Sequence, residues 1–281
     1  MIYRTEAGGR EILRRYEQAL ASWPVPAEHV RVPTREGDTF VLVCGPDDAP
    51  PLLLLHGSGA NATMWMGDVT AWAEHFRVHA VDMIGEPGLS APSRPPLDSP
   101  AYALWLDDVL DHLGIERTAV TGASLGGWLA LDYATRRPDR VERLALLCPG
   151  GIGRQKVGAL LKALLYKPFG RWGMRRSIKA VAGVDVRAMP EVADYLALTF
   201  THFLPRRDRL PVFPDDVLRR LTMPVLVIVG GRDAMLDSHD TAKRMNHAVP
   251  HANVTLLPDV AHAIVGQTQP ILDFLRARAT G

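Results

Sequence analysis

Three side chains in the sequence, Ser124, Asp233 and His262, have the types needed for nucleophilic catalysis at a carbonyl group. A serine hydroxyl becomes a nucleophile when a histidine accepts its proton. An aspartate can hold the other ring nitrogen of that histidine and stabilise the imidazolium. Together these residues would transfer an acyl group through a covalent acyl-enzyme.

Ser124 lies in the run G-A-S-L-G, residues 122–126, which matches a G-x-S-x-G pattern. The residues before it, 118–121, predict a short buried strand, and residues 126–136 predict a helix that ends before Pro138. The serine would then lie on a sharp strand-to-helix turn, where only small neighbours leave room for a strained backbone. An ordinary turn with a helix-capping serine is the alternative interpretation.

A second candidate element is the loop H-G-S-G, residues 56–59, which follows the apolar run Pro51–Leu55. A glycine-rich loop after a buried strand exposes backbone N–H groups near the carboxyl edge of the sheet. We predict that the amides of Ser58 and Leu125 form an oxyanion hole. A flexible turn without this role is the alternative, and His56 is expected to be a structural hydrogen-bonding residue rather than the base.

The acid is expected after the apolar strand Pro224–Val229, where the chain continues into a loop that contains Asp233. An acid in that loop could orient a histidine. Asp237 and Asp240 are close enough in sequence to be rivals, and a solvated loop aspartate is the alternative for all three. We predict Asp233 as the acid, with Asp237 next.

The base is expected at His262, which follows the predicted strand Val254–Leu257. Of the ten histidines, it is the one in a post-strand loop downstream of the acid. Others, such as His79, are expected on helix faces or at the surface. The sequence contains no phosphate-binding loop or H-E-x-x-H zinc helix, so we expect no cofactor and no metal.

Residues 82–90, D-M-I-G-E-P-G-L-S, resemble the D-x-x-G-x-G-x-S turn of the α/β-hydrolase family, with one additional residue between its glycines. With the serine turn and the H-G-S-G loop, the resemblance spans residues 52–271. The additional residue and Asp237, at the place of a more familiar proline, resemble the naproxen-type carboxylesterases, bacterial enzymes with a helical cap. The resemblance implies Ser124 as nucleophile, His262 as base and Asp233 as orienting acid.

The predicted elements fit an α/β fold. Residues 10–23 predict an amphipathic helix, and residues 30–43 predict an antiparallel hairpin around E-G-D. Strand-sized apolar runs then alternate with helical patterns, near Leu52, Val78, Ala119, Leu144, Val225 and Val254. This alternation predicts a mostly parallel central sheet with helices on both faces.

The strands that end at Cys148 and begin at Val225 are separated by about 75 residues, far more than the roughly 12 that a crossover needs. We therefore predict a hydrolase core in residues 1–150 and 221–281 and an inserted helical cap in residues 151–220. Apolar residues recur at helical spacing in 157–166, and basic residues fill the gaps. A cap with a solvated basic face is our interpretation. The alternative is a lid that meets anionic lipid or draws in an acidic substrate.

Composition excludes several classes of protein. With 281 residues, a formal charge of +1 and 47% hydrophobic residues, the chain fits one globular domain with an insertion rather than a disordered or nucleic-acid-binding protein. The start lacks the apolar stretch of a signal peptide, and no apolar run is long enough for stable membrane insertion, so we expect a cytoplasmic protein. The two cysteines, Cys44 and Cys148, are expected to be buried thiols. Oligomeric state stays open.

We predict a serine carboxylesterase that acts on a small-molecule ester, with Trp65, Trp128 and Met235 as candidate pocket residues. Ordinary core packing is the alternative interpretation for each of the three. Carbon–carbon bond hydrolases of the fold share the H-G-S-G loop. They usually carry Asn before the nucleophile and Trp after the histidine, where this chain has Ala123 and Ala263. Thioesterase and lactonase activities remain alternatives on the same triad. A catalytically silent ligand-binding module is the alternative from another class.

Overall fold

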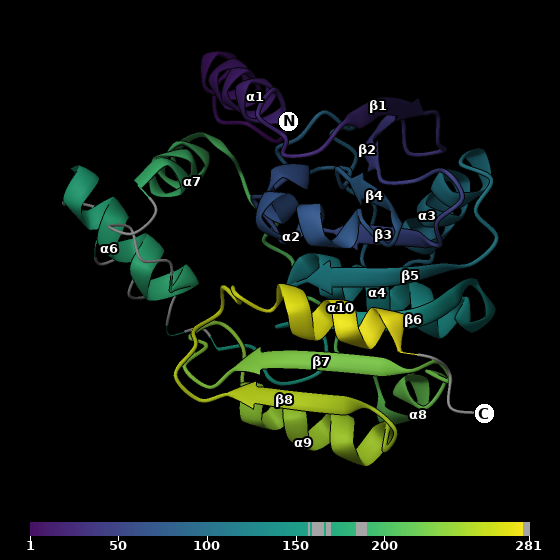
Figure 1. Ribbon diagram of the computed structural model, residues 1–281. Coiled ribbons are helices and arrows are strands. Elements are labelled where there is room, and N and C mark those ends of the chain that lie inside the picture. Colours follow the sequence, from purple (N-terminus) through teal and green to yellow (C-terminus); the bar gives the residue numbers. More distant parts are fainter. Residues whose placement is uncertain (157, 159–165, 167–169, 184–189, 278–281) are drawn as a thin grey trace.

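The computed structural model describes residues 1–156, 158, 166, 170–183 and 190–277 (Figure 1). Its strands are β1 (Ala27–Val32), β2 (Thr39–Cys44), β3 (Pro51–Leu55), β4 (Arg77–Val81), β5 (Thr118–Ala123), β6 (Val141–Leu147), β7 (Val225–Gly230) and β8 (Asn253–Leu257). Its α-helices are α1 (Glu6–Leu20), α2 (Met66–Trp72), α3 (Ala101–His112), α4 (Leu125–Arg136), α6 (Gly170–Ala182), α7 (Pro190–His202), α8 (Asp215–Leu218), α9 (Ser238–Ala248) and α10 (Thr268–Arg276). Short 3₁₀ helices are η1 (Ala62–Trp65) and η2 (Pro138–Arg140).

The strands form one eight-stranded sheet in the order β1-β2-β4-β3-β5-β6-β7-β8. β1 pairs with β2 in antiparallel orientation, with Val30 opposite Val41, which confirms the predicted hairpin. β2 is also antiparallel to β4, and every later pair is parallel. The prediction of a mostly parallel sheet is therefore confirmed.

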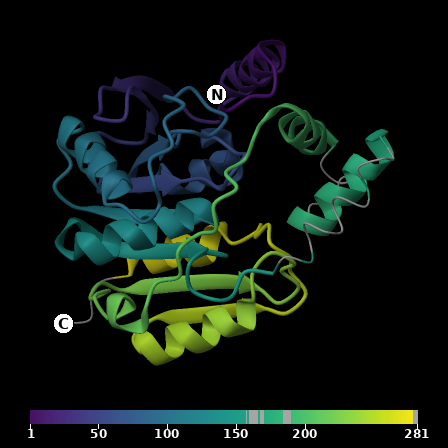
Figure 2. The same ribbon diagram turned by 180° about the vertical axis from the view of Figure 1, so that it is seen from behind.

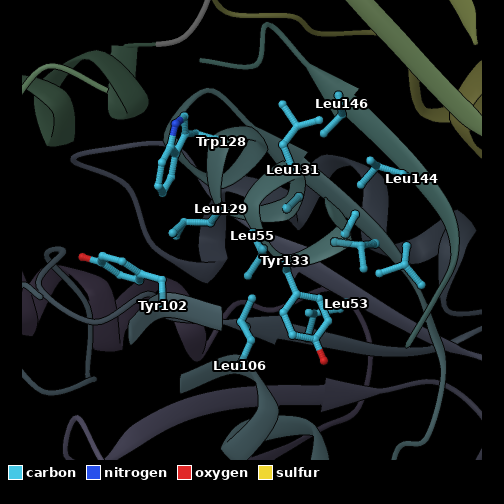
Figure 3. Close-up of a cluster of buried hydrophobic side chains, with 14 of the residues drawn as sticks. Leu53, Leu55, Tyr102, Leu106, Trp128, Leu129, Leu131, Tyr133, Leu144 and Leu146 are labelled. Atoms are coloured by element: carbon cyan, nitrogen blue, oxygen red, sulfur yellow. The ribbon is translucent and has the colours of Figure 1, made fainter. Parts of the chain in front are cut away.

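The central strands are apolar on both faces because helices cover both sides of the sheet. Leu53 and Leu55 belong to one core cluster, while the alternate residues Leu52 and Leu54 belong to the other. The first cluster includes residues of α3, α4, α8 and α9, and Figure 3 shows part of it. The second includes residues of α1, α2 and α10, which lie on the opposite side of the sheet (Figures 1 and 2). This two-sided burial is the reason for the unbroken leucine run in β3.

Two local predictions need correction. Helix α1 begins at Glu6 rather than near residue 10, because the Thr5 hydroxyl accepts a hydrogen bond from the Gly8 amide at 3.1 Å and caps an earlier turn. His79 was expected on a helix face or at the surface, but it lies in β4 between β2 and β3 and is 6% exposed. Burial lowers the pKa of His79 to about 4.

Helices α6, α7 and α8 lie in the long segment between β6 and β7. Figures 1 and 2 show α6 and α7 apart from the layers of the sheet, with α7 close to α1. Most of the apolar stretch 157–166 lies outside the described residues, and the proposed cap boundaries at 151 and 220 remain a prediction. In the ranges that the structure describes, no helix is long and apolar enough to cross a membrane.

Candidate active site

The parallel strands bring the three candidate residues to one edge of the sheet. Ser124 follows β5, Asp233 follows β7 and His262 follows β8. Because the carboxyl ends of parallel strands meet at the same edge, residues far apart in sequence become neighbours there. The long crossover connections thus assemble one site from three separate segments.

The side chains of these residues form a continuous hydrogen-bonded chain. His262 Nε2 lies 2.9 Å from Ser124 Oγ, and His262 Nδ1 lies 2.7 Å from Asp233 Oδ2. In the tautomer that satisfies both contacts, Nδ1–H donates to the carboxylate and Nε2 accepts from the serine hydroxyl. This arrangement can remove a proton from Ser124 while the charge on the imidazole is stabilised.

The backbone of Ser124 has φ 51° and ψ −108°, a conformation that residues other than glycine rarely adopt. Although Ser124 precedes α4, its hydroxyl makes no capping hydrogen bond to the helix and instead contacts His262. A Cβ atom at Gly122 would lie 2.5 Å from the carbonyl oxygen of Gly126, so the sharp turn leaves no room for a side chain there. The turn therefore presents the Ser124 hydroxyl to His262 rather than to the backbone of α4.

Asp233 is held firmly on its side of the site. Its Oδ1 atom accepts hydrogen bonds from the amides of Met235 at 2.7 Å and Leu236 at 3.0 Å, which leaves Oδ2 for His262. Burial acts to raise the pKa of Asp233, but the hydrogen bonds and charge of His262 and the two amides outweigh it. The net pKa lies below the usual range, so the group stays ionised.

The rival acid Asp237 caps a helix and pairs with an arginine. Its Oδ1 atom accepts a hydrogen bond from the Asp240 amide at 3.1 Å and caps the start of α9. Its other carboxylate oxygen pairs with Arg154 at 3.2 Å. The structure thus places Asp233, and not Asp237, against the histidine.

The H-G-S-G loop lies beside the serine. A Cβ atom at Gly57 would lie 3.6 Å from Cβ of Ser124, and the next residue, Ser58, is exposed. Leu125, whose amide is the other predicted oxyanion donor, is the first residue of α4 and is 7% exposed. Both predicted donors thus belong to segments that border Ser124.

His56 has a structural place, as the sequence suggests. Its Nε2 atom accepts a hydrogen bond from the Met83 amide at 3.0 Å, and its Nδ1 atom lies 2.8 Å from the Gly57 carbonyl oxygen. Full burial lowers the pKa of His56 to about 4, so the ring is neutral and links the loop to the chain after β4.

The three candidate pocket residues lie in different surroundings. Trp65 and Trp128 are each 1% exposed and belong to the two core clusters, where Trp128 stacks on Phe213. Met235 is half-buried in the loop after β7. Core packing accounts for the burial of both tryptophans, and contact of any of the three with a substrate stays a prediction.

Cys148 is a neighbour of the site that sequence reasoning did not assign to it. It follows β6 with φ 41°, and its thiol sulfur lies within 4.8 Å of a carboxylate oxygen of Asp233. Burial raises the pKa of this thiol, so it stays protonated. Cys148, Asp233 and His262 bring potential metal-ligand atoms within 4.8 Å of one another, but His262 and Asp233 already bind each other. Strand β6 lies between β5 and β7 in the sheet, so the residue that follows it lies between the segments that carry Ser124 and Asp233.

Residues 52–277 match the model of the "Alpha/beta hydrolase family". The chain belongs to this family. Among relatives of known sequence, this chain is 30% identical over 274 residues to the "Uncharacterized carboxylesterase nap" of Bacillus subtilis, which covers 91% of this chain and 87% of the relative. Among solved structures, it is similar to carboxylesterase CesB (YbfK) of B. subtilis, with a TM-score of 0.83, 29% identity and coverage of 96% and 99% of the two chains.

A further relative of this chain carries a different name. The 2-hydroxy-6-oxononadienedioate/2-hydroxy-6-oxononatrienedioate hydrolase of Cupriavidus pinatubonensis is 30% identical over 264 residues, which covers 82% of this chain and 88% of the relative. The comparisons therefore establish the family, together with a relationship to carboxylesterases at about 30% identity.

Proposed function

We propose that this hydrolase cleaves carboxylic esters of small molecules through an acyl-enzyme, with Ser124 as nucleophile. The observation that carries the proposal is the unbroken chain from Ser124 Oγ through both ring nitrogens of His262 to Asp233. Relatives named as carboxylesterases, which match nearly the whole chain, support the choice of ester over other acyl substrates. The compartment in which we expect this activity is the cytoplasm.

In the first half of the reaction, Ser124 Oγ attacks the ester carbonyl carbon while its proton passes to His262 Nε2. Asp233 stabilises the resulting imidazolium. The amides of Ser58 and Leu125 donate hydrogen bonds to the oxyanion of the tetrahedral intermediate. His262 then returns the proton to the leaving alkoxide as the carbon–oxygen bond breaks, which releases an alcohol and leaves an acylated serine.

In the second half, a water molecule attacks the acyl carbon and transfers a proton to His262 Nε2. Collapse of the new tetrahedral intermediate breaks the bond to Ser124 Oγ, which takes back the proton from Nε2. The acid product leaves, and the site returns to its starting state. No cofactor is consumed in this scheme.

The experiment that tests the proposal is turnover of a series of p-nitrophenyl esters, from acetate to long acyl chains, by the wild-type protein and by Ser124→Ala. We expect release that depends on Ser124, with the variant reduced at least about 1,000-fold. Serine-dependent release that peaks at one chain length would also size the acyl pocket. Unchanged turnover in the variant would reject Ser124 as the nucleophile.

A second candidate is hydrolysis of a carbon–carbon bond, which the relationship to the Cupriavidus 2-hydroxy-6-oxononadienedioate/2-hydroxy-6-oxononatrienedioate hydrolase favours. Against it stand Ala123 before the nucleophile and Ala263 after the histidine. Labelling of Ser124 by a fluorophosphonate without ester turnover would favour this reaction, or a thioester or lactone substrate. Failure of both labelling and turnover would favour a silent binding module.

A further inference from the structure

The additional residue in the turn after β4 places a carboxylate inside the protein. The turn runs from Asp82 to Ser90, and Glu86 and Pro87 stand between Gly85 and Gly88, where the family pattern has one residue. Glu86 is only 2% exposed. A buried carboxylate is costly unless its oxygens accept hydrogen bonds, so its partners indicate why it is there.

The partners of Glu86 are both in the loop beside Ser124. Its Oε2 atom accepts a hydrogen bond from the Gly59 amide at 2.6 Å and one from the Ser58 hydroxyl at 3.2 Å. Ser58 is the residue whose amide we propose as an oxyanion donor. One carboxylate oxygen of Glu86 thus binds the amide of Gly59, the residue that directly follows Ser58.

The turn that carries Glu86 is itself anchored. Asp82 accepts hydrogen bonds from the amides of Leu89 at 2.7 Å and Ala62 at 2.9 Å, and Asn61 Nδ2 donates to the Pro87 carbonyl oxygen at 3.1 Å. The loop at 57–62 and the turn at 82–90 are therefore joined at several points. A fixed turn can hold the loop in one position.

Burial of Glu86 has an energetic cost that its surroundings only partly offset. Burial raises the pKa of Glu86 to about 7, while the Gly59 amide, the Ser58 hydroxyl and the charges of Arg94 and Arg206 act to lower it. The two arginines donate hydrogen bonds to backbone carbonyl groups, Arg94 to that of Gly85 at 2.9 Å and Arg206 to that of Pro95 at 2.7 Å. Retention of a costly buried group beside a reactive serine is typical of functional sites.

We propose that Glu86 is a positioning residue of the active site, whose carboxylate holds the Gly57–Gly59 loop so that the Ser58 amide faces the developing oxyanion. The inference rests on the proposed oxyanion hole and hence on the proposed function. Glu86 acts through the loop and does not touch the reacting atoms. Its loss should therefore lower kcat and leave KM nearly unchanged, because the displaced donor matters most in the transition state.

The test compares Glu86→Ala with Glu86→Gln, whose amide oxygen can still accept the hydrogen bond from Gly59. Two rates are measured: ester turnover, resolved into kcat and KM, and the second-order rate at which an alkyl fluorophosphonate labels Ser124. Removal of one oxyanion donor costs on the order of 100- to 1,000-fold, so displacement of the loop should cost about 10- to 100-fold in Glu86→Ala. Glu86→Gln should recover most of that loss.

Asp132→Asn is the matched control, because Asp132 is also a buried carboxylate, 3% exposed, but pairs with Arg136 within α4. We expect both of its rates within about threefold of wild type. If Glu86→Ala does not fold, Glu86→Asp takes its place, since the shorter side chain withdraws the acceptor from Gly59. Glu86→Asp should lower kcat for ester turnover and the labelling rate of Ser124 by about 10-fold or more.

The inference is overturned if the folded Glu86→Ala protein keeps both rates within threefold of wild type, if KM alone changes, or if Glu86→Gln is as impaired as Glu86→Ala. The labelling rate reports the oxyanion hole without requiring that the substrate be an ester. Wild-type protein that is labelled but hydrolyses no ester would therefore refute the proposed function while the comparison of Glu86 variants still stands.

Discussion

Asp233 Oδ2 lies 2.7 Å from Nδ1 of His262, while Oδ1 of the same carboxylate is bound by two backbone amides. The carboxylate is therefore fixed from both sides and can orient the imidazole. Substitution of Asp233 by Asn would favour the wrong tautomer, with Nδ1 as acceptor and Nε2 protonated. We expect Asp233→Asn to lower kcat about 10,000-fold, measured with a p-nitrophenyl ester.

The matched control for this prediction is Asp237→Asn. Asp237 is the rival acid in sequence, but it caps α9 and pairs with Arg154. We expect this variant to lose on the order of 1 kcal/mol of stability at most, with kcat within a fewfold of wild type. A larger kcat loss in Asp237→Asn than in Asp233→Asn would contradict the assignment of the acid.

Close packing around the serine turn predicts opposite effects of alanine at two glycines. A Cβ atom at Gly126 would collide with the carbonyl oxygen of Leu55, whereas one at Gly67, in α2, would meet nothing within 4 Å. Gly126→Ala should lower Tm and activity together, since the helix must shift away from β3. Gly67→Ala should raise stability by about 0.5–1 kcal/mol, because alanine favours the helix. Thermal unfolding measures both, and equal Tm changes would refute the argument.

The burial of Glu86 predicts that the stability difference between wild type and Glu86→Gln depends on pH. Burial raises its pKa from 4.5 to about 7, so folding disfavours the charged form. Below pH 4.5 the group is neutral in both folded and unfolded states and carries no penalty. As pH rises toward 7 the penalty grows, up to on the order of 3 kcal/mol. The Tm of Glu86→Gln minus that of wild type should therefore be larger at pH 8 than at pH 4.5.

The measurement is the Tm difference between Glu86→Gln and wild type across this pH range, which cancels the titration of all unchanged groups. A difference of several degrees that develops between pH 4.5 and 7 is expected. A pH-independent difference would show that Glu86 has no raised pKa in the folded protein.

A small apolar cluster joins the N-terminal segment to α7. Ile12 is fully buried and packs in a cluster with Ile2 and Phe203, and the Leu204 amide donates to the Ile2 carbonyl oxygen at 2.8 Å. Ile12→Ala should cost about 2–4 kcal/mol and make α7 easier to cleave by protease. Urea unfolding and limited proteolysis test this, with Val265→Ala as control because Val265 is 69% exposed. Equal stability of the two variants would contradict it.

The sequence predicts much of the fold because periodicity and chain order are local signals. The leucine run of β3 indicates a strand buried on both faces, and the G-x-S-x-G run between a strand and a helix indicates the serine turn. The family assignment, which rests on these motifs, is confirmed by the match over residues 52–277. Local patterns also predict His262, the histidine in the loop that follows the last strand.

Only the tertiary structure decided which groups meet across the sheet edge. Asp233 and Asp237 are both loop acids in sequence, and the capping of α9 by Asp237 distinguishes them. His79 was misplaced because a pattern does not reveal which strand lies inside a sheet. The approach of Cys148 to Asp233 and the hydrogen bond from Gly59 to Glu86 join segments far apart in the chain. Such contacts depend on the order of strands and the path of loops, which no local run of residues encodes.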